Sequence, residues 1–404
     1  MPETVTLAEI EAARPLVEAV AVPTPMIESR WLSQVLGARV HLKCENLQRT
    51  GSFKVRGSAV RIARLTEEER ERGVVAASAG NHAQGVALAA QQHGISARVY
   101  MPEGAPIPKE RATRGYGAEV IFEGTYLEDS LAVAKEYADR TGAVLVHPFD
   151  HADIVAGQGT LGLEILEQCP DVATVVVPTG GGGLIGGVAT ALKAHRPGIR
   201  VVGVQAAAAA AYPRSLAEGR PLRLDSMATM ADGIAVGQPG EIPFALVREH
   251  VDEILTVSEE EMSRTLLALV EREKLVVEPA GAVGAAALCV DPDRFEGPVV
   301  VVLSGGNIDP LLLGKVIQHG MAAARRYLNL QVTVPDLPGG LVGMLSQVAE
   351  AGANVLEVVH ERISPSLHLN EVDVHLHLET RGEPHAEAVL ARLRERGYAV
   401  IERG

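Results

Sequence analysis

The chain has 404 residues, a net charge of −14, and 47% hydrophobic against 22% charged residues. This length predicts more than one domain, and the composition is typical of a folded globular protein. The acidic charge argues against a nucleic-acid-binding protein, and no apolar run is long enough to cross a bilayer. Cys44, Cys169 and Cys289 lie far apart and form no paired motif, which indicates a reducing, cytoplasmic environment.

Short β-branched runs alternate with helical patterns along most of the chain. The expected strands cover residues 74–77, 97–101, 119–122, 145–147, 174–177, 201–204 and 299–303. Each run is followed by glycine, proline or a turn, which is the pattern of buried parallel strands joined by helical crossovers. The sequence therefore predicts an α/β architecture up to about residue 327.

The pattern changes after residue 327. A strand at 329–334 precedes a helix from 341, strands at 354–362 and 371–379 flank a turn at 364–366, and a helix at 384–396 leads to a last strand at 398–401. This order, βαββαβ, predicts a ferredoxin-like domain. His375 and His377 share one face of their strand, but no third ligand has readable spacing, so a solvated or subunit-facing surface is favoured over a metal site.

The first motif with chemical meaning covers residues 51–57, GSFKVRG. Val55, Ala59 and Ile62 form an apolar helical stripe, which places Lys54 near the start of a helix. There, the helix dipole and nearby arginines disfavour an ammonium ion and should lower the pKa of Lys54. A lysine with a lowered pKa is suited to nucleophilic catalysis, although the spacing alone clearly favours an exposed surface lysine.

Three further motifs each follow an expected strand. Residues 78–82, SAGNH, open a helix and predict either a carboxylate or phosphate site or a plain helix cap. Residues 180–184, GGGGL, predict a phosphate cradle of backbone N–H groups. A GxGxxG spacing is present there, but the next strand ends at Gln205 and a run of alanines instead of the acid that a dinucleotide site needs. Residues 304–307, SGGN, add a hydroxyl at a fourth strand end.

These motifs together supply a lysine, a carboxylate site, a phosphate cradle and a hydroxyl, which is the set that pyridoxal phosphate uses. Residues 42–57, 78–84, 180–184 and 304–307 resemble threonine dehydratase (threonine ammonia-lyase), a fold-type II pyridoxal-phosphate enzyme with a two-lobed α/β, tryptophan synthase β-like fold. Residues 328–404, with DLPGGL at 336–341, resemble an ACT domain, a regulatory amino-acid-binding module. The implied organisation is a catalytic domain over 1–327, with a small lobe at about 50–150, and a regulatory domain over 328–404.

The resemblance implies β-elimination of L-threonine to 2-oxobutanoate and ammonia, and of L-serine to pyruvate. Lys54 would attach the cofactor and later remove the Cα proton, and the neutral hydroxyl of Ser304 would face the pyridine nitrogen, which suits β-elimination. The implied cofactor contacts are Phe53, Lys54, Asn81, Gly180, Gly181, Gly182, Gly183, Leu184 and Ser304, and the implied substrate contacts are Ser78, Gly80, Asn81 and His82.

Two related enzymes and one non-enzyme are alternatives. A serine racemase needs a second base, and the matching position holds Ala79, which cannot take a proton. Racemases and hydroxyaspartate dehydratases carry acidic metal ligands where this chain has Gln205, Ala209 and Ala211, so no metal site is expected. A non-catalytic amino-acid sensor would have lost Lys54, which is present.

The ACT resemblance implies regulation by an amino acid such as isoleucine and assembly into a homodimer or homotetramer. The implied effector contacts are Asp336, Gly339, Gly340 and Leu341. The sequence leaves open the biosynthetic or catabolic role, the preference for threonine or serine, the binding of a monovalent cation and the role of Glu278.

Overall fold

The computed structural model describes residues 4–362, 368 and 370–403, and the chain divides into two compact units, Met1–Leu312 and Leu313–Gly404. The division falls inside helix α14 (Pro310–Ala323), whereas the boundary expected at 327 marks the start of strand β11 (Tyr327–Pro335). The buried residues of α14 are Val316 and Gly320, so little of this helix is packed into a core. The contacts therefore divide the chain within α14, and the functional boundary at residue 327 stays a prediction.

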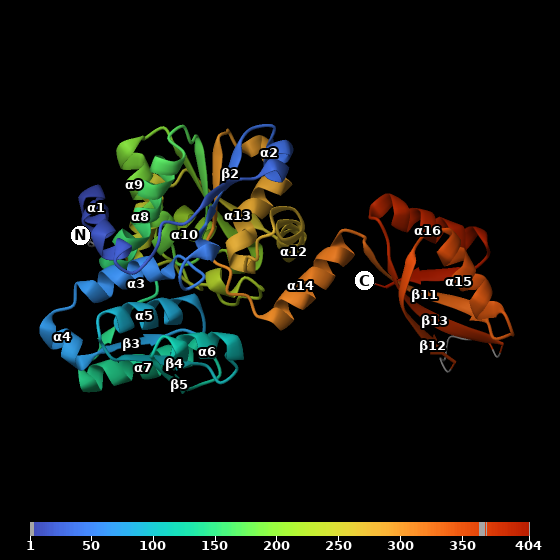
Figure 1. Cartoon of the computed structure of the whole chain (residues 1–404), viewed down its shortest axis with the longest axis horizontal. Coiled ribbons are helices and arrows are strands. Elements are labelled where there is room, and N and C mark those ends of the chain that lie inside the picture. Colours follow the sequence, from blue (N-terminus) through green and yellow to red (C-terminus); the bar gives the residue numbers. More distant parts are fainter. Residues whose placement is uncertain (1–3, 363–367, 369, 404) are drawn as a thin grey trace. The chain divides into compact units, whose positions relative to one another are not determined.

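The first unit contains a six-stranded sheet and a four-stranded sheet (Figure 1). Strands β2, β10, β7, β8 and β9 of the large sheet are parallel, and the edge strand β1 pairs with β2 in the antiparallel direction. The small sheet is parallel throughout. The large sheet has the order β1 (Met26–Glu28), β2 (Val40–Cys44), β10 (Val299–Leu303), β7 (Thr174–Pro178), β8 (Arg200–Ala206), β9 (Glu253–Val257), and the small sheet has the order β5 (Glu119–Phe122), β4 (Ala97–Met101), β3 (Val74–Ala77), β6 (Val144–Leu145).

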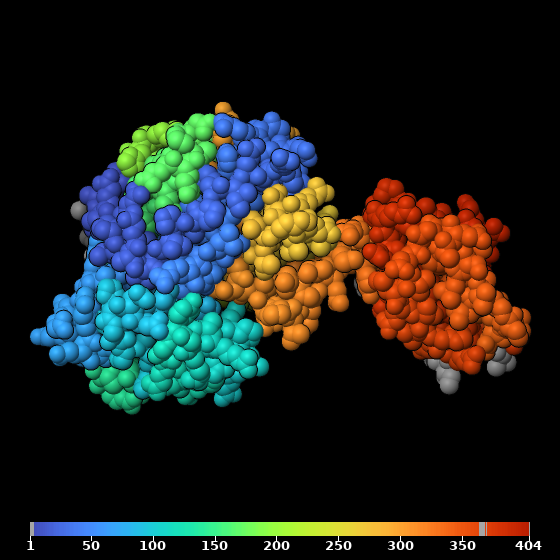
Figure 2. Space-filling view, in the orientation of Figure 1, coloured from blue at the N-terminus to red at the C-terminus, as the bar shows by residue number. Residues whose placement is uncertain are grey.

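The expected α/β architecture of this unit is confirmed. Strands β3, β4, β5 and β10 have the predicted bounds, while β6 covers only Val144–Leu145 of the run near residues 145–147. The small sheet and its helices, coloured light blue to teal, gather on one side of the unit (Figure 2). The helices of the first unit are α1 (Leu7–Glu18), α2 (Arg30–Leu36), α3 (Lys54–Ala63), α4 (Glu67–Arg72), α5 (Asn81–Gln92), α6 (Ile107–Gly115), α7 (Leu127–Thr141), α8 (Ala152–Gln168), α9 (Gly183–His195), α10 (Ala211–Glu218), α11 (Glu241–His250), α12 (Glu259–Ala268) and α13 (Pro279–Val290).

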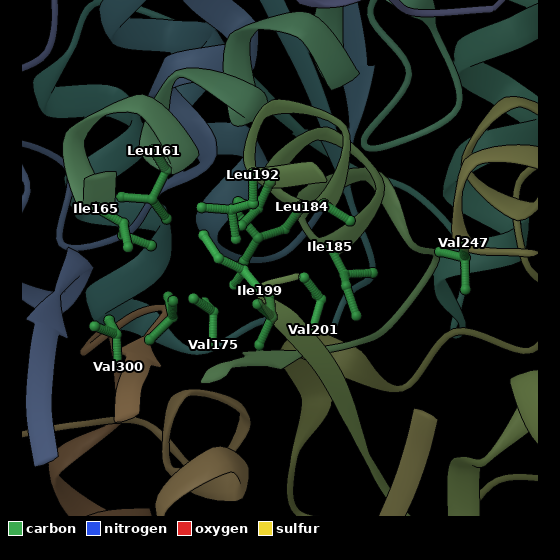
Figure 3. Packing of buried hydrophobic residues seen from close by; sticks show 14 of the residues in the cluster. Leu161, Ile165, Val175, Leu184, Ile185, Leu192, Ile199, Val201, Val247 and Val300 are labelled. Atoms are coloured by element: carbon green, nitrogen blue, oxygen red, sulfur yellow. The ribbon is translucent and has the colours of Figure 1, made fainter. Parts of the chain in front are cut away.

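The core of the large sheet is a layer of aliphatic side chains between the strands and helices α8 and α9. Leu161 and Ile165 of α8 and Leu192 of α9 point toward Val175 of β7 and Val300 of β10 (Figure 3). Every residue of β7 and β10 is buried, as expected for central parallel strands covered on both faces. This packing fixes the start of α9 relative to the carboxyl ends of these strands.

Glycines bring helices α3, α8 and α9 into backbone contact. A Cβ on Gly57 of α3 would lie 2.8 Å from the Ile154 carbonyl oxygen, and one on Gly157 of α8 would lie 2.6 Å from the Arg56 carbonyl oxygen. A Cβ on Gly187 of α9 would lie 2.3 Å from the Val155 carbonyl oxygen. These distances leave no room for a side chain, so α8 holds α3 on one side and α9 on the other at minimal separation.

The second unit contains an antiparallel sheet with the order β12-β13-β11-β14. With its two helices it has the expected βαββαβ order, and this chain order with this sheet order is ferredoxin-like. The turn expected at residues 364–366 lies outside the described residues. The elements are β11, α15 (Gly340–Glu350), β12 (Asn354–Glu361), β13 (Glu371–Glu379), α16 (Glu383–Glu395) and β14 (Ala399–Glu402).

Strand β13 separates apolar from polar side chains as predicted, with one exception. Val372, Val374, Leu376 and Leu378 are in the core, whereas His375 and His377 are half-buried beside Glu361 and Glu357 of β12, each at 2.9 Å. The exception is Asp373, which is buried because it accepts hydrogen bonds from Gln331 and Thr333. The histidines therefore have carboxylate partners, and no group of three or more His, Cys, Asp or Glu side chains suited to a metal occurs in the described ranges.

None of the helices in the described part of the chain combines the length and apolar character that a membrane crossing requires.

Candidate functional site

The four sequence motifs meet at one cavity of about 320 Å³ in the first unit. Its walls come from the start of α3, the turns after β3 and β7, and the end of β10, because the carboxyl ends of parallel strands open toward the same side. Every cofactor and substrate contact expected from the sequence lines this cavity: Phe53, Lys54, Ser78, Gly80, Asn81, His82, Gly180, Gly181, Gly182, Gly183, Leu184 and Ser304.

Lys54 is the first residue of α3, as the sequence predicts, and its side chain faces the cavity. The Nζ atom donates a hydrogen bond to the carbonyl oxygen of Pro148 at 2.9 Å. Burial lowers the pKa of Lys54 to about 8, and the negative charge of Glu278 opposes part of this shift. The pKa of Lys54 is lowered as the sequence predicts. The main cause is burial, whereas the sequence analysis attributed the shift to the helix dipole and nearby arginines.

Arg56 has a different role, because its guanidinium is fully buried and points away from the cavity. Its Nε and Nη2 atoms donate to the two oxygens of Glu45 at 2.8 Å, and Nη1 donates to Glu164 of α8 at 2.6 Å. Glu164 also accepts a hydrogen bond from Lys43 of β2 at 2.6 Å. Two cations and two carboxylates therefore neutralise one another inside the unit and tie α3 to β2 and α8.

The turn before α9 is shaped for an anion. Gly182 has φ +98°, and a Cβ there would lie 1.8 Å from the hydroxyl oxygen of Tyr212. A Cβ on Gly181 would lie 2.5 Å from the ring of Phe149. Only glycines fit, and the turn presents the first N–H groups of α9, which have no acceptors within the helix, to the cavity. These residues fit the phosphate group of pyridoxal phosphate.

The turn after β3 presents a second set of backbone N–H groups at the start of α5. Ser78 Oγ accepts a hydrogen bond from the Gly80 N–H at 3.1 Å, which shapes the turn. The His82 ring contacts the carbonyl oxygen of Val146 at 2.8 Å, and burial, with the charge of Lys54, lowers the pKa of His82 to about 3. A neutral His82 therefore braces the turn against the end of β6.

Lys109 and Asp232 line the same cavity and were not singled out by the sequence. Lys109 Nζ of α6 is 2.6 Å from Asp232 Oδ2, so an ion pair joins the helices of the small sheet to a loop of the large-sheet lobe. The two residues are 123 positions apart. No local pattern connects residues at that separation, and only the fold shows that they are partners.

Glu278 also lines the cavity, and its side chain is buried at the start of α13. Its Oε1 atom accepts a hydrogen bond from Asn81 Nδ2 at 2.6 Å. Burial and the charge of Asp232 raise the pKa of Glu278 to about 7, although Lys109, Asn81 and Lys54 favour the ionised form. The sequence showed that Glu278 belongs to a motif but gave no contact for it.

Of the three positions that hold acidic metal ligands in related enzymes, Gln205 has a polar side chain here, and Ala209 and Ala211 have none. Gln205 is fully buried, and its Oε1 atom accepts a hydrogen bond from the Tyr212 N–H at 2.9 Å.

The predicted effector residues are at the β11–α15 turn of the second unit, where Gly339 has φ +93° and a Cβ on Gly340 would lie 2.4 Å from the Pro335 carbonyl oxygen. That turn therefore requires glycine at both positions.

Comparison with known proteins identifies the same chemistry. The family described as "Pyridoxal-phosphate dependent enzyme" matches residues 17–305. The L-threonine ammonia-lyase of Thermotoga maritima is 47% identical, over 98% of this chain and 99% of that protein. A solved threonine deaminase, whose source is abbreviated T.th., has 44% identity and a TM-score of 0.72, covering 75% of this chain and 99% of its own. Maize serine racemase has 35% identity and a TM-score of 0.74, covering 78% of this chain and 97% of its own.

The cavity contains the groups that this cofactor requires: a lysine with a lowered pKa, a glycine cradle and a hydroxyl at a strand end. The family match covers both sheets of the first unit. The chain belongs to the family of pyridoxal-phosphate-dependent enzymes that includes the L-threonine ammonia-lyases.

Proposed function

We propose that this protein is a pyridoxal-phosphate-dependent lyase that converts L-threonine to 2-oxobutanoate and ammonia, and L-serine to pyruvate. The observation that carries the proposal is the meeting of Lys54 with the glycine turn and the turn after β3 in one cavity. The 47% identity to an L-threonine ammonia-lyase over nearly the whole chain supports threonine as the substrate.

Lys54 is the attachment point of the cofactor and then the base of the reaction. Its pKa of about 8 leaves a substantial fraction of the amine neutral near physiological pH. Bound pyridoxal phosphate supplies the electron sink that makes the Cα proton of the substrate acidic. The neutral amine of Lys54, which faces the cavity, would take this proton.

The remaining residues bind and orient. The first N–H groups of α9, from the turn at Gly180–Leu184, hold the phosphate. The N–H groups of the turn at Ser78–His82 would hold the substrate carboxylate, and the second N–H of Asn81 Nδ2 would donate to the ring hydroxyl. Ser304 and Phe53 line the cavity, where Ser304 would offer a neutral hydroxyl to the pyridine nitrogen and Phe53 would flank the ring.

Serine racemisation is the second candidate, because maize serine racemase is a structural neighbour. Racemisation needs a group on the opposite face of the substrate to return the proton. Ala79 lines the cavity at the position expected for that group and has no titratable atom. The proposal therefore favours elimination over racemisation.

The test is the release of keto acid from L-threonine by the purified protein loaded with pyridoxal phosphate. Steady 2-oxobutanoate production is expected, with pyruvate from L-serine. D-serine is assayed in the same reactions by chiral chromatography. Loaded protein that makes D-serine but no keto acid would be a racemase, and loaded protein without either product would act on another amino acid.

We also propose that the second unit is an ACT-type regulatory domain that binds an amino acid such as isoleucine. Its βαββαβ order and the two required glycines of the β11–α15 turn support this proposal. Asp336, Gly339, Gly340 and Leu341 would contact the effector, with backbone N–H groups facing its carboxylate. Titration of keto-acid release with isoleucine tests it, with D-isoleucine as the control.

The proposal includes assembly into a homodimer or homotetramer and a cytoplasmic location. Cys44 and Cys169 are buried free thiols and Cys289 is half-buried, which suits a reducing compartment. Size-exclusion chromatography with light scattering, with and without isoleucine, measures the oligomeric state.

A further inference from the structure

A series of hydrogen bonds runs from Glu278 through the side chains of Asn81 and Asn307 to the backbone carbonyl of Thr50. Asn81 Nδ2 donates to Glu278 Oε1 at 2.6 Å, and Asn81 Oδ1 accepts from Asn307 Nδ2 at 2.8 Å. Asn307 Nδ2 also donates to the carbonyl oxygen of Thr50 at 2.6 Å. These hydrogen bonds therefore link the start of α13, the start of α5, the loop before α3 and the loop after β10.

The order of donors along this hydrogen-bond series permits one orientation of the Asn81 amide. A backbone carbonyl can only accept, so the group of Asn307 that contacts Thr50 and Asn81 must be its NH₂. Asn81 must then accept through its oxygen, which directs its own NH₂ to the Glu278 carboxyl group. One N–H of Asn81 remains for a ligand in the cavity.

Glycines leave the space that these side chains occupy. A Cβ on Gly305 would lie 2.3 Å from Glu278 Oε1, and one on Gly51 would lie 2.3 Å from Asn307 Oδ1. Gly51 also has φ +71°, so both its backbone conformation and the lack of space disfavour a side chain there. Glycine backbone therefore packs directly against Glu278 at one end of the hydrogen-bond series and against Asn307 toward the other end.

We propose that Glu278 is a positioning residue, which acts through Asn81 by fixing its amide so that an N–H points to the bound cofactor. Glu278 itself need not touch the cofactor. The proposal depends on the proposed function only in that Asn81 contacts pyridoxal phosphate. It gives a role to a buried carboxyl group that neither the lysine chemistry nor the phosphate cradle uses.

Charged groups of three other elements also face Glu278. Asp232, in the loop before α11, disfavours its ionised form, whereas Lys109 of α6 and Lys54 of α3 favour it. Because the Lys109–Asp232 ion pair largely cancels, the hydrogen bond from Asn81 is the directional contact. A carboxyl oxygen accepts this hydrogen bond in either protonation state, so positioning does not depend on a single pH.

The test is a double-mutant cycle on the affinity of the cofactor-free protein for pyridoxal phosphate, measured by absorbance titration. Glu278→Ala and Asn81→Ala are each expected to raise the Kd about tenfold, and the double variant is expected to match Asn81→Ala within about twofold. Glu278→Gln keeps an acceptor oxygen and is expected to stay within about threefold of wild type. Glu273→Ala, which removes the carboxylate partner of Ser29 outside the cavity, is the control.

The thermal midpoint of each cofactor-free variant is recorded, and Glu278→Met replaces Glu278→Ala in the cycle if the alanine variant does not fold. Effects that multiply in the double variant would show that Glu278 acts independently of Asn81 and overturn the proposal. An unchanged Kd in Glu278→Ala, or a glutamine variant as weak as the alanine variant, also overturns it. Failure of the wild type to bind the cofactor would instead contradict the proposed function.

Discussion

Lys54 and Arg56 are separated by one residue on α3, yet their charges have opposite environments. Residues two apart on a helix face different directions, so Lys54 faces the cavity while Arg56 faces α8 and β2. Arg56 meets two carboxylates at hydrogen-bond distance, and Lys54 donates to a neutral carbonyl oxygen. The sequence placed both residues at the start of a helix, but each side chain also has a partner more than 90 residues away, Pro148 for Lys54 and Glu164 for Arg56.

Replacing Lys54 with alanine is expected to lower the rate of keto-acid release by a factor of about 10³ or more, because it removes the general base and the attachment point. Keto-acid release from L-threonine with excess cofactor measures the effect. Lys135→Ala, on the exposed side of α7, is the control. Substantial residual activity in Lys54→Ala would contradict its assignment.

The pH dependence of cofactor attachment is expected to follow the Lys54 amine. Only the neutral amine attacks the cofactor, so the attachment rate should rise as the pH rises through about 8 and level off above it. Glu278, when ionised, raises the pKa of Lys54, so Glu278→Gln should move this midpoint to lower pH. Stopped-flow absorbance across pH 6 to about 10 measures the midpoint. A midpoint that moves to higher pH would contradict this electrostatic coupling.

At the scale of elements, the buried parallel strands were the most predictable and the polar or edge strands the least. The apolar runs of β3, β4 and β10 gave their bounds directly, because these strands are largely buried. Strand β5 was also predicted, although it is an edge strand in which only Val120 is buried. Strand β2 was missed, since Lys43 interrupts its apolar pattern, and the partner of Lys43, Glu164, is 121 positions away. Strands β1 and β9 were missed because they are partly exposed edges.

The ion network of Arg56 is expected to stabilise the first unit strongly. Arg56→Met leaves Glu45 and Glu164 buried with fewer counter-charges, which should lower the free energy of unfolding by about 3–5 kcal/mol. Urea denaturation of the cofactor-free protein measures this change. Arg14→Met removes a partly exposed ion pair and should cost about 1 kcal/mol or less. Equal costs for the two variants would contradict the network's role.

The turn before α9 is expected to tolerate no side chain at Gly182. Gly182→Ala combines a φ of +98° with a Cβ 1.8 Å from Tyr212, so the turn must move and cofactor Kd should rise at least about tenfold. Gly198→Ala is the matched control, because a Cβ there meets nothing within 4 Å. Absorbance titration compares the two, and equal Kd values would show that the cradle does not depend on this glycine.

At the scale of the whole molecule, the motifs showed which residues carry chemistry, and the fold showed what orients them. Lys54, Asn81 and Ser304 each follow or begin an element that local patterns reveal, so their shared location at strand ends could be predicted. Lys109, Asp232 and the contact of Glu278 could not, because they join segments that only the folded chain brings together. The boundary at residue 327 stays a prediction, and the contacts divide the chain earlier, within α14.

Deleting residues 326–404 is expected to leave keto-acid release within about threefold of the full chain, because every residue of the cavity is in the first unit. A solved threonine deaminase that covers 75% of this chain and 99% of its own shows that such a shorter chain folds. The variant should lose any response to isoleucine that the full chain shows. Inhibition retained after deletion would place the effector site in the first unit.

The glycine contacts along α8 limit which mutations the enzyme can accept. Gly157 and Gly187 set the spacing of α3 and α9 from α8, and both of these helices begin at the cavity, at Lys54 and at the glycine turn. Even alanine, one methyl group larger, must push a helix outward. The faces of α3 and α9 that contact α8 should therefore vary little among functional homologues. This holds although Gly157 and Gly187 are not expected to contact the cofactor or the substrate.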